Sequence, residues 1–254
     1  MIDPLKHITA TVVSRREITG ELWVVRIRPE ERISFTSGQY VTIGLPASPK
    51  LVERPYSVAS SPREEELEFF LELVPHGQLT PQLYQVAVGG QVYMRRSAKG
   101  RFVLDTASGH RNHFLIATVT GVAPYVSMAR ELAARAAGGE SFPYRLAVLQ
   151  GSSVSVELAY QQELESLAQA HAWFGYVPTI SRTWLEPEWK GELGRCEDVT
   201  RKHVDLLGWT AADTTVYACG NPDMIENVKG VLKRVGFQKE SLKEEVYWVA
   251  EKAG

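Results

Sequence analysis

The chain has 254 residues, of which 44% are hydrophobic and 23% charged, and its formal net charge is -2. This length fits one large domain or two ordinary ones, and the composition is that of a globular protein. The charge argues against a general nucleic-acid binder, and no stretch approaches the roughly 18 apolar residues of a membrane span. The N-terminal segment lacks the apolar core of a signal peptide, so we expect a cytoplasmic protein.

Cysteine and histidine usage argues against a metal site in this chain. Cys196 and Cys219 are too few for a common iron–sulfur cluster, so such a cluster would have to belong to a partner. Cys196 matches no pattern and receives no role. His110 and His113 have a spacing that could hold a metal, but no carboxylate or thiol is near, and a solvated loop is expected. A serine hydrolase is also disfavoured, because no G-x-S-x-G is present.

The first hundred residues have the pattern of short strands separated by glycine and proline. Apolar residues alternate along 21–29, 39–46 and 67–75. Frequent turns between short strands predict a closed antiparallel barrel. No long amphipathic helix is expected before residue 100.

From residue 113 the pattern changes to strands that alternate with helices, which predicts parallel βαβ units. The last helix should begin at Asn221 as N-cap, with Pro222 in its first position, and Gly236 should end it. A polar connector near 102–112 separates the two patterns. The expected strands are 113–119, 144–150, 174–181 and 214–220, and the expected helices are 125–137, one carrying Tyr160, Leu164, Leu167 and Ala168 on one face, and one beginning at Asn221.

Ligands of doubly wound sheets bind at the carboxyl ends of the strands. Three such ends carry suitable residues, namely Thr118–Gly121, Ser181–Arg182 and Cys219–Gly220. We therefore expect their side chains to converge on one site.

Five short patterns occur in a fixed order: RPYSVAS at 54–60, VPHGQLTPQL at 74–83, TVTGVAPY at 118–125, YACGNPDM at 217–224 and EEVYW at 244–248. Together they resemble the bacterial branch of the ferredoxin/flavodoxin–NADP⁺ reductase family over essentially the whole chain. The resemblance implies an antiparallel Greek-key β-barrel that binds FAD at 1–104. It also implies a parallel-sheet, Rossmann-like NADP(H) domain at 105–254, with a C-terminal tail that reaches the flavin.

By this resemblance, Arg54 offers a guanidinium fork to the FAD pyrophosphate, Tyr56 packs its ring on the flavin, and Ser57 lies near the atom that receives the hydride. Phe70 lies on the face of Glu68 and Glu72, and an aromatic ring on a polar face suggests a ligand. The alternative is that neither segment binds a ligand. Arg54 would then be a surface arginine and Tyr56 a core tyrosine at a strand end, and the second segment would be a plain loop after a strand. The second flavin segment would comprise Phe70, Leu71, Leu73, Gln78, Leu79 and Thr80.

The phosphate loop departs from the family pattern at one position. The family usually has a glycine where this chain has Val119, and a β-branched residue is costly at positive φ. Val119 therefore either has ordinary strand dihedrals or reshapes the loop. Thr120, Gly121 and the following helix start still predict a pyrophosphate site.

The choice of NADP(H) rests on charge. Ser181, Arg182 and Arg195 match residues that bracket the 2′-phosphate in relatives, and no acid follows the strand at 144–150 until Glu157. Ser153 stands where a third family arginine would be. The alternative is that both arginines are simply solvated.

The resemblance implies four catalytic residues, Ser57 in the barrel and Cys219, Glu245 and Tyr247 late in the chain. Cys219 and Gly220 would lie beside the nicotinamide, although a buried core cysteine is the alternative. Glu245 fits a carboxylate that assists hydride transfer. Tyr247 fits the aromatic residue that stacks on the flavin, and Trp248 could serve instead or hold the adenine end of FAD.

The implied reaction moves hydride between NADPH and FAD, and single electrons between FAD and an acidic ferredoxin or flavodoxin. A monomer is expected, with no metal, nucleic acid or membrane partner. An NADH-dependent reductase of an oxygenase or haem system is one alternative, a flavin subunit without nicotinamide activity is another, and a flavin-free structural module is a third. The positive charges of Arg95, Arg96, Lys99 and Arg101 are expected to attract the acidic partner protein. The alternative is that this basic run is simply a solvated surface.

Overall fold

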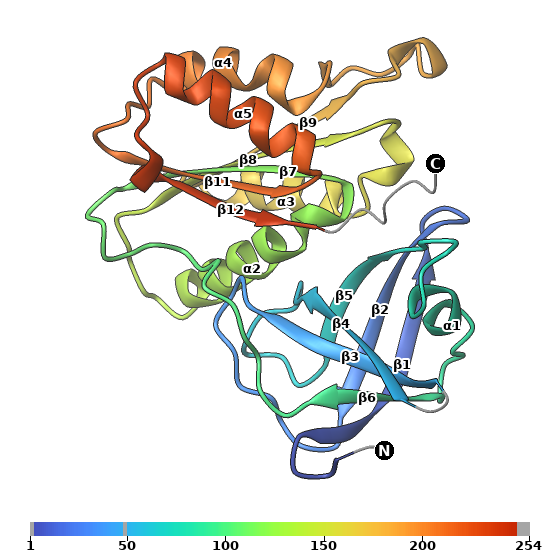
Figure 1. The fold of residues 1–254 in the computed structure, drawn as a ribbon. Helices are drawn as coiled ribbons and strands as arrows, with labels where there is room; N and C mark the ends of the chain where they lie inside the picture. The colour runs from blue at the N-terminus through green and yellow to red at the C-terminus, as the bar shows by residue number, and fades with distance from the viewer. Residues whose placement is uncertain (1–2, 48–49, 248–254) are drawn as a thin grey trace. The chain divides into compact units, whose positions relative to one another are not determined.

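The computed structural model describes residues 3–47 and 50–247. The chain forms two compact units, and the boundary between them falls between Val103 and Leu104. Each unit has its own sheet and its own hydrophobic core (Figure 1).

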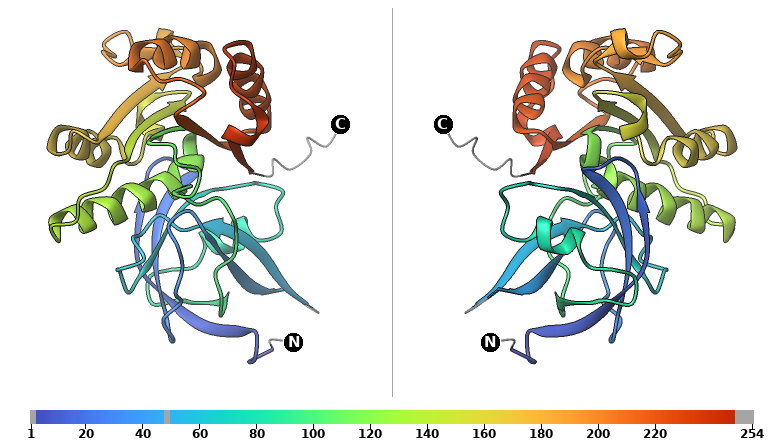
Figure 2. Two further views of the ribbon diagram at one scale, coloured as in Figure 1. Left: turned by 90° about the vertical axis from the view of Figure 1, so that its left-hand side faces the viewer. Right: turned by 90° about the vertical axis from the view of Figure 1, so that its right-hand side faces the viewer.

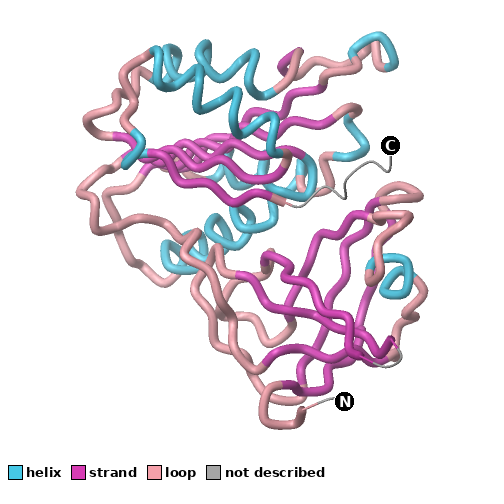
Figure 3. The backbone as a smooth tube through the Cα atoms, in the orientation of Figure 1, coloured by secondary structure: helices cyan, strands magenta, loops and turns pink. Residues whose placement is uncertain are grey.

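The first unit is a six-stranded antiparallel sheet with the strand order β4-β3-β6-β1-β2-β5. Strand β6 is inserted between β3 and β1 instead of following β5, which is a Greek-key arrangement and not a meander. A short helix, α1, follows β5 (Figure 3). The elements are β1 (His7–Glu17), β2 (Leu22–Pro29), β3 (Tyr40–Ala47), β4 (Lys50–Ser57), β5 (Leu67–Glu72), α1 (Thr80–Tyr84) and β6 (Gln91–Arg95).

The sheet curves into a barrel because the segment after β4 lies against β5. The main-chain N–H of Ala59 donates to the carbonyl oxygen of Glu68 at 2.8 Å. Alternate residues of β5 point into the core opposite alternate residues of β2. The resulting pairs are Leu67 with Ile27, Phe69 with Val25, and Leu71 with Trp23.

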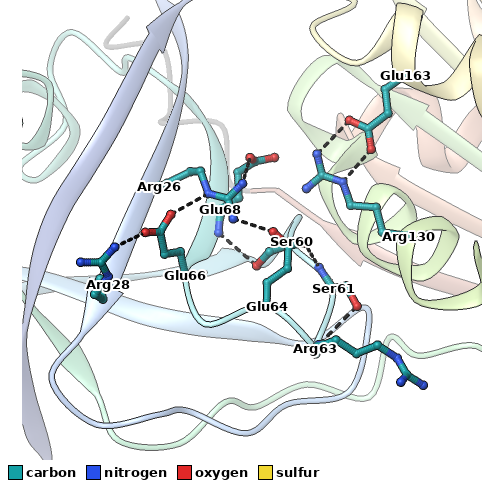
Figure 4. A network of polar contacts seen from close by, with 10 residues as sticks. All are labelled: Arg26, Arg28, Ser60, Ser61, Arg63, Glu64, Glu66, Glu68, Arg130 and Glu163. Atoms are coloured by element: carbon teal, nitrogen blue, oxygen red, sulfur yellow. Dashed lines mark hydrogen bonds and ion pairs between the residues drawn. The ribbon is translucent and has the colours of Figure 1, made fainter. Parts of the chain in front are cut away.

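A cluster of charged residues ties β2 to the loop before β5 (Figure 4). The guanidinium of Arg26 lies 2.5 Å from a Glu64 oxygen, 3.0 Å from Glu66 and 3.7 Å from Glu68. Arg28 contacts Glu66 at 2.5 Å. Because burying a charge is costly unless it is paired, the cluster explains how Glu68 can be only 6% exposed.

The second unit is a six-stranded parallel sheet with the strand order β10-β9-β8-β7-β11-β12. Its strands are β7 (Asn112–Thr118), β8 (Arg145–Ser152), β9 (Phe174–Ile180), β10 (Glu192–Leu193), β11 (Thr214–Gly220) and β12 (Leu242–Val246). Its α-helices are α2 (Ala123–Ala137), α3 (Gln161–Ala170), α4 (Cys196–Leu207) and α5 (Pro222–Arg234). Short 3-10 helices connect them at η1 (Val119–Val122), η2 (Ser155–Glu157), η3 (Thr183–Leu185) and η4 (Lys239–Ser241).

Helices cover both faces of this sheet (Figures 1 and 2). Helices α4 and α5 pack on the face formed by Phe114, Ile116 and Leu149. Helices α2 and α3 cover the other face, and Arg130 of α2 makes a two-pronged ion pair with Glu163 of α3, at 2.7 and 2.8 Å (Figure 4). Because both faces of the sheet are covered, β7 is buried along almost its whole length.

The predicted fold class, an antiparallel barrel followed by a parallel-sheet α/β domain, is confirmed. The Asn221 N-cap is also confirmed, because its side chain accepts hydrogen bonds from the N–H groups of Asp223 and Met224 at 2.8 and 3.1 Å. Helix α4 was not predicted from the sequence. No described helix is long and apolar enough to cross a bilayer.

Candidate active site

The carboxyl ends of β7 and β11 lie side by side and carry two of the sequence motifs. Ala117 of β7 pairs with Cys219 of β11, and β7 then continues through Thr118 into η1. The Thr118 hydroxyl accepts the main-chain N–H of Asn221 at 2.9 Å. This bond joins the start of the η1 loop to the start of α5. The loops that follow β7 and β11 therefore lie together at one edge of the sheet, although they are far apart in the sequence.

Two glycines allow these loops to approach each other closely. Gly220 has φ +118°, and a Cβ there would stand 2.4 Å from the Thr118 hydroxyl oxygen. A Cβ on Gly121 would meet the main chain of Cys219 and Gly220. At Gly121 the two loops therefore touch backbone to backbone, and a phosphate loop needs such a close approach of bare main chain.

Val119 has a φ of 42°, and it is the single non-glycine residue with positive φ within the described part of the chain. Ordinary strand dihedrals, one of the two expectations for this position, are therefore wrong. The loop follows the backbone path that glycine would take, although it carries a β-branched side chain. Such a conformation costs of order 1–3 kcal/mol.

Cys219 is fully buried beside residues of the C-terminal segment. It pairs with Glu245 in the β11–β12 register, and the N–H of Tyr247 donates to the Gly220 carbonyl at 3.0 Å. Burial raises the pKa of the Cys219 thiol well above its usual range, the Glu245 carboxylate raises it further, and a hydrogen bond with Tyr247 opposes the shift. The thiol therefore stays neutral near pH 7.

Tyr125, at the start of α2, is buried against the same group of residues. Its hydroxyl donates to the Ile116 carbonyl at 3.1 Å. Burial raises the pKa of Tyr125, and Cys219, Glu245 and Tyr247 raise it further. Sequence reasoning assigned Tyr125 no role, because an aromatic residue after a proline resembles ordinary helix core.

The residues predicted to bind the 2′-phosphate follow two neighbouring strands, β9 and β10. Ile180 of β9 pairs with Leu193 of β10, so Arg182 and Arg195 each lie two residues beyond a paired position. The N–H of Arg182 donates to the Ser153 carbonyl at 2.9 Å. The Ser181 hydroxyl donates to the Ser152 carbonyl at 3.3 Å, and both arginine side chains are exposed.

Glu157 lies closer to this edge than its position in the sequence suggested. Helix η2 turns the chain back, and the Glu157 carboxylate accepts the N–H of Ser153 at 2.8 Å and that of Val154 at 3.4 Å. Glu186 accepts the N–H of Ser155 at 2.9 Å. Glu157 is the first acid after β8, as the sequence showed, and its carboxylate lies at Ser153 beside the end of the strand.

The first unit places Arg54, Tyr56 and Ser57 at the end of β4. Tyr56 pairs with Val41 of β3 and packs against the barrel core, and Ser57 is 6% exposed. The Tyr56 hydroxyl oxygen is buried and has no hydrogen-bond partner among the described residues. Arg54 is exposed and donates to the Glu53 carbonyl at 2.7 Å.

The residues after β5 form a turn that Thr80 closes. The Thr80 hydroxyl accepts the N–H of Val74 at 2.9 Å. The side chains of Leu71 and Leu79 are buried in the barrel core, so a cofactor could contact only their backbone, whereas Leu73 is partly buried against this core. Gln78 is exposed.

Phe70 corrects one sequence expectation. Its ring was placed on a polar face, but Phe70 is 4% exposed and its strand neighbour Glu68 is 6% exposed. Glu68 is paired with Arg26, which removes the polar surface that alternation alone suggested.

His113 corrects another expectation, because it is a buried residue of β7 and not part of a solvated loop. Its Nδ1 atom lies 3.2 Å from the Tyr217 hydroxyl. Burial is the main reason that the pKa of His113 falls to about 4. His110 bonds Thr215 at 2.9 Å, and the described residues contain no group of three metal-binding side chains.

Two predictions remain to be placed in the structure, that of Trp248 and that of the basic run. Trp248 lies outside the described residues, as does the tail beyond it. In the predicted basic run, Arg95 is engaged by Glu53 at 2.8 Å through two bonds, and Arg96 contacts Glu31. Lys99 and Arg101 are exposed.

Comparison with known proteins assigns the two units. Residues 9–103 match the oxidoreductase FAD-binding domain, and residues 115–230 match the oxidoreductase NAD-binding domain. A flavodoxin/ferredoxin–NADP reductase of Rhodobacter capsulatus is 30% identical over 257 residues, covering 96% of this chain and 92% of the relative. The chain belongs to the ferredoxin/flavodoxin–NADP⁺ reductase family.

Two other comparisons report a further relative in sequence and a solved structure with the same fold. The reductase component DmpP of a phenol 2-monooxygenase from Pseudomonas sp. strain CF600 is 28% identical, covering 99% of this chain and 69% of the relative. The structure of a ferredoxin NADP⁺ reductase from Neisseria gonorrhoeae with bound FAD and NADP superimposes with a TM-score of 0.84 at 20% identity. That match covers 96% of this chain and 99% of the other. This member of the reductase family is thus a flavoprotein oxidoreductase that acts on NAD(P)H, with FAD and a nicotinamide dinucleotide as cofactors.

Proposed function

We propose that the chain is a monomeric, FAD-dependent NADPH reductase that exchanges single electrons with a ferredoxin or flavodoxin. The observation that carries the proposal is the joined edge of β7 and β11, where Thr118, Gly121 and Gly220 bring two loops together beside Cys219. A flavin, when bound, accepts hydride from a nicotinamide and releases electrons one at a time. The remaining roles belong to the side chains of this chain.

In the first unit, the Tyr56 hydroxyl has no hydrogen-bond partner among the described residues, and a buried hydroxyl is costly without one, so this group fits a bound flavin. We assign Arg54 to the pyrophosphate, Ser57 to the hydride-accepting edge, and the backbone at Phe70, Leu71 and Leu73 to the flavin's flank. Residues Gln78, Leu79 and Thr80 would border the phosphates.

In the second unit, Thr120 and Gly121 would hold the dinucleotide pyrophosphate, with the start of α2 supplying N–H groups. Cys219 would contact the nicotinamide as a neutral thiol, since its pKa is raised by burial. Glu245 would orient the same ring, and Tyr247 would cover the flavin when no nucleotide is present. A role for Trp248 in covering the flavin or holding FAD stays a prediction.

The 2′-phosphate of NADPH would lie among Ser181, Arg182 and Arg195. Two exposed guanidinium groups at neighbouring strand ends favour a dianion. Substituting Arg182→Ala or Arg195→Ala should weaken NADPH binding about tenfold and leave NADH binding unchanged. The matched control is Arg201→Ala, an exposed arginine that pairs with Asp205 on α4.

The protein that exchanges electrons with the flavin would be attracted by positive charges on this chain. Within the basic run, Arg95 pairs with Glu53 and Arg96 pairs with Glu31. Lys99 and Arg101 are exposed and pair with neither of these carboxylates. An acidic carrier would be attracted to them, and the rate of its reduction should fall as salt rises.

A specific observation also favours the NADH-dependent alternative. Glu157 brings a carboxylate to Ser153 at the end of β8, where NAD sites place an acid. The similarity to an oxygenase reductase component points the same way. An NADH-using reductase of an oxygenase or haem system is therefore the second candidate.

One experiment separates these functions. The FAD-loaded full chain is titrated anaerobically with NADPH and, separately, with NADH, while the flavin absorbance is recorded. The proposal expects bleaching at lower NADPH than NADH concentration, followed by reoxidation with ferredoxin or flavodoxin. Preference for NADH supports the second candidate, and a yellow protein that neither nucleotide bleaches supports a flavin subunit without nicotinamide activity. A chain that takes up no FAD contradicts all three.

A further inference from the structure

A buried glutamine and a tyrosine connect two strands to the η1 loop. Gln150, near the end of β8, is 0% exposed. The Tyr176 hydroxyl of β9 donates to its Oε1 atom at 2.8 Å. The Gln150 Nε2 atom in turn donates to the Val119 carbonyl oxygen at 3.4 Å. The chain of bonds therefore runs from β9 through β8 to the residue with positive φ.

Gln150 occupies a position where the pattern of the strand predicts an apolar side chain. Ala147 and Leu149 of β8 belong to the core under α4 and α5. By alternation, Leu146, Val148 and Gln150 face the opposite side, and the first two are fully buried. Burying an amide in such a row is unfavourable unless it is hydrogen-bonded, so the two bonds of Gln150 account for its presence.

The bond to Val119 determines the direction of one peptide group in the loop. A trans peptide is planar, and its C=O and N–H groups point in opposite directions. Because Gln150 holds the Val119 carbonyl toward itself, the N–H of Thr120 is directed away from Gln150. Thr120 lies in the segment that we assign to the pyrophosphate, where such donors bind anions.

We propose that Gln150, held by Tyr176, is a positioning residue that keeps the Val119–Thr120 peptide oriented for the phosphates of the dinucleotide. A glycine at position 119 would adopt the same backbone freely, whereas valine resists it. The glutamine supplies the orientation that a valine loop lacks. This inference rests on the proposed function of the loop.

The test measures binding and not only turnover. The FAD-loaded full chain is titrated calorimetrically with NADP⁺ and with NADPH under anaerobic conditions. The double variant Gln150→Leu with Tyr176→Phe removes both members of the Tyr176–Gln150 bond, so neither side chain leaves the other without a partner and folding should persist. The Val119 carbonyl is the group that loses its bond to Gln150. We expect three- to tenfold weaker nucleotide binding, the loss of about one hydrogen bond, with unchanged FAD content. In turnover, KM for the nucleotide should rise more than kcat falls.

The same double substitution in a Val119→Gly protein distinguishes a positioning role of Gln150 from a merely structural one. In the Val119→Gly variant the same double substitution should change nucleotide affinity less than about twofold, because glycine needs no support. The matched control is Asn112→Leu, which removes a buried amide bonded to Asp213 at 2.9 Å at the other end of β7. This control should leave nucleotide affinity unchanged.

Two results would overturn the inference. One is wild-type nucleotide affinity in the double variant, and the other is an equal loss of affinity with valine or glycine at position 119. Failure of the wild-type chain to bind any nicotinamide dinucleotide would instead contradict the proposed function. The two failures are distinguishable because the wild-type titration is measured first.

Discussion

The α-carbon of Gly121 lies so close to Cys219 that a Cβ atom at position 121 would stand 2.4 Å from the Cys219 carbonyl oxygen. The contacted atom is backbone in a central strand, so it cannot rotate away. This contact joins the η1 loop of the proposed dinucleotide site to the residue proposed to lie beside the nicotinamide.

Gly121→Ala should therefore displace the η1 loop. Overpacking of this kind costs about 1–3 kcal/mol of stability, and nucleotide affinity should fall because the loop cannot keep its path. Gly175→Ala in β9 is the matched control, because its nearest neighbours would be 3.9 Å away. Thermal unfolding and NADP⁺ titration of both variants check the prediction, and normal affinity in Gly121→Ala would contradict it.

Asn221→Ala should destabilise α5 without removing the bond between the loops. The Asn221 side chain caps two N–H groups, whereas its own main-chain N–H binds Thr118 and survives the substitution. Loss of such a cap costs about 1 kcal/mol. Denaturant unfolding of the second unit should show this loss, and Asn221→Asp should restore most of the stability. A variant with wild-type stability would show that the cap contributes nothing.

Tyr56→Phe should have opposite effects on the empty and the loaded protein. Its hydroxyl is buried without a described partner, and burial raises the pKa of Tyr56 while Arg54 opposes the shift. Removing the hydroxyl should leave the FAD-free protein equally stable or more stable. FAD affinity should fall about three- to tenfold if the flavin supplies the missing partner.

The control for Tyr56 is Tyr84→Phe, which removes a hydroxyl bonded to Glu17 at 3.2 Å on the barrel surface. FAD affinity, measured from the flavin fluorescence released on dilution, should not change in the control. Equal FAD affinity in wild type and Tyr56→Phe would remove the Tyr56 hydroxyl from the flavin site.

Elements with strong local signals were predictable from the sequence. The alternation in β2 and β5 and the Asn221–Pro222 start of α5 follow from short-range rules. Helix α4 was missed because Arg195 at its N-cap position and the charged residues that follow resemble a surface loop. Amphipathic spacing of Cys196, Val199, Thr200 and His203, all buried, was the available signal.

Predictions failed where three-dimensional contacts override local pattern. Phe70 and Glu68 alternate as an exposed face should, but pairing with Arg26 allows Glu68 to be buried. Glu157 follows the end of β8 by five residues, and η2 turns the chain so that its carboxylate returns to Ser153. The Val119 carbonyl accepts a hydrogen bond from Gln150, thirty-one positions later, and no local rule could predict that contact.

His113 predicts how the stability of the second unit depends on pH. Burial lowers its pKa from 6.5 to about 4, Asp105 opposes the shift, and His110 and Lys243 add to it. The unfolded chain therefore binds a proton near pH 6.5 that the folded chain refuses until about pH 4. The free energy of unfolding should thus fall as pH drops through this window, by up to about 3 kcal/mol. Denaturant unfolding at several pH values between 7.5 and 4 measures this slope.

His113→Gln should flatten that slope, because glutamine does not titrate and can still bond the Tyr217 hydroxyl, which also accepts the N–H of Asp105 at 2.8 Å. The exposed His76→Gln substitution is the control and should keep the wild-type slope. A carboxylate such as Glu53, whose pKa falls to about 2 mainly through its bond to Arg95, loses its contribution only below about pH 4.5. A slope between pH 6.5 and 5 that persists in His113→Gln would therefore assign the pH dependence to another group.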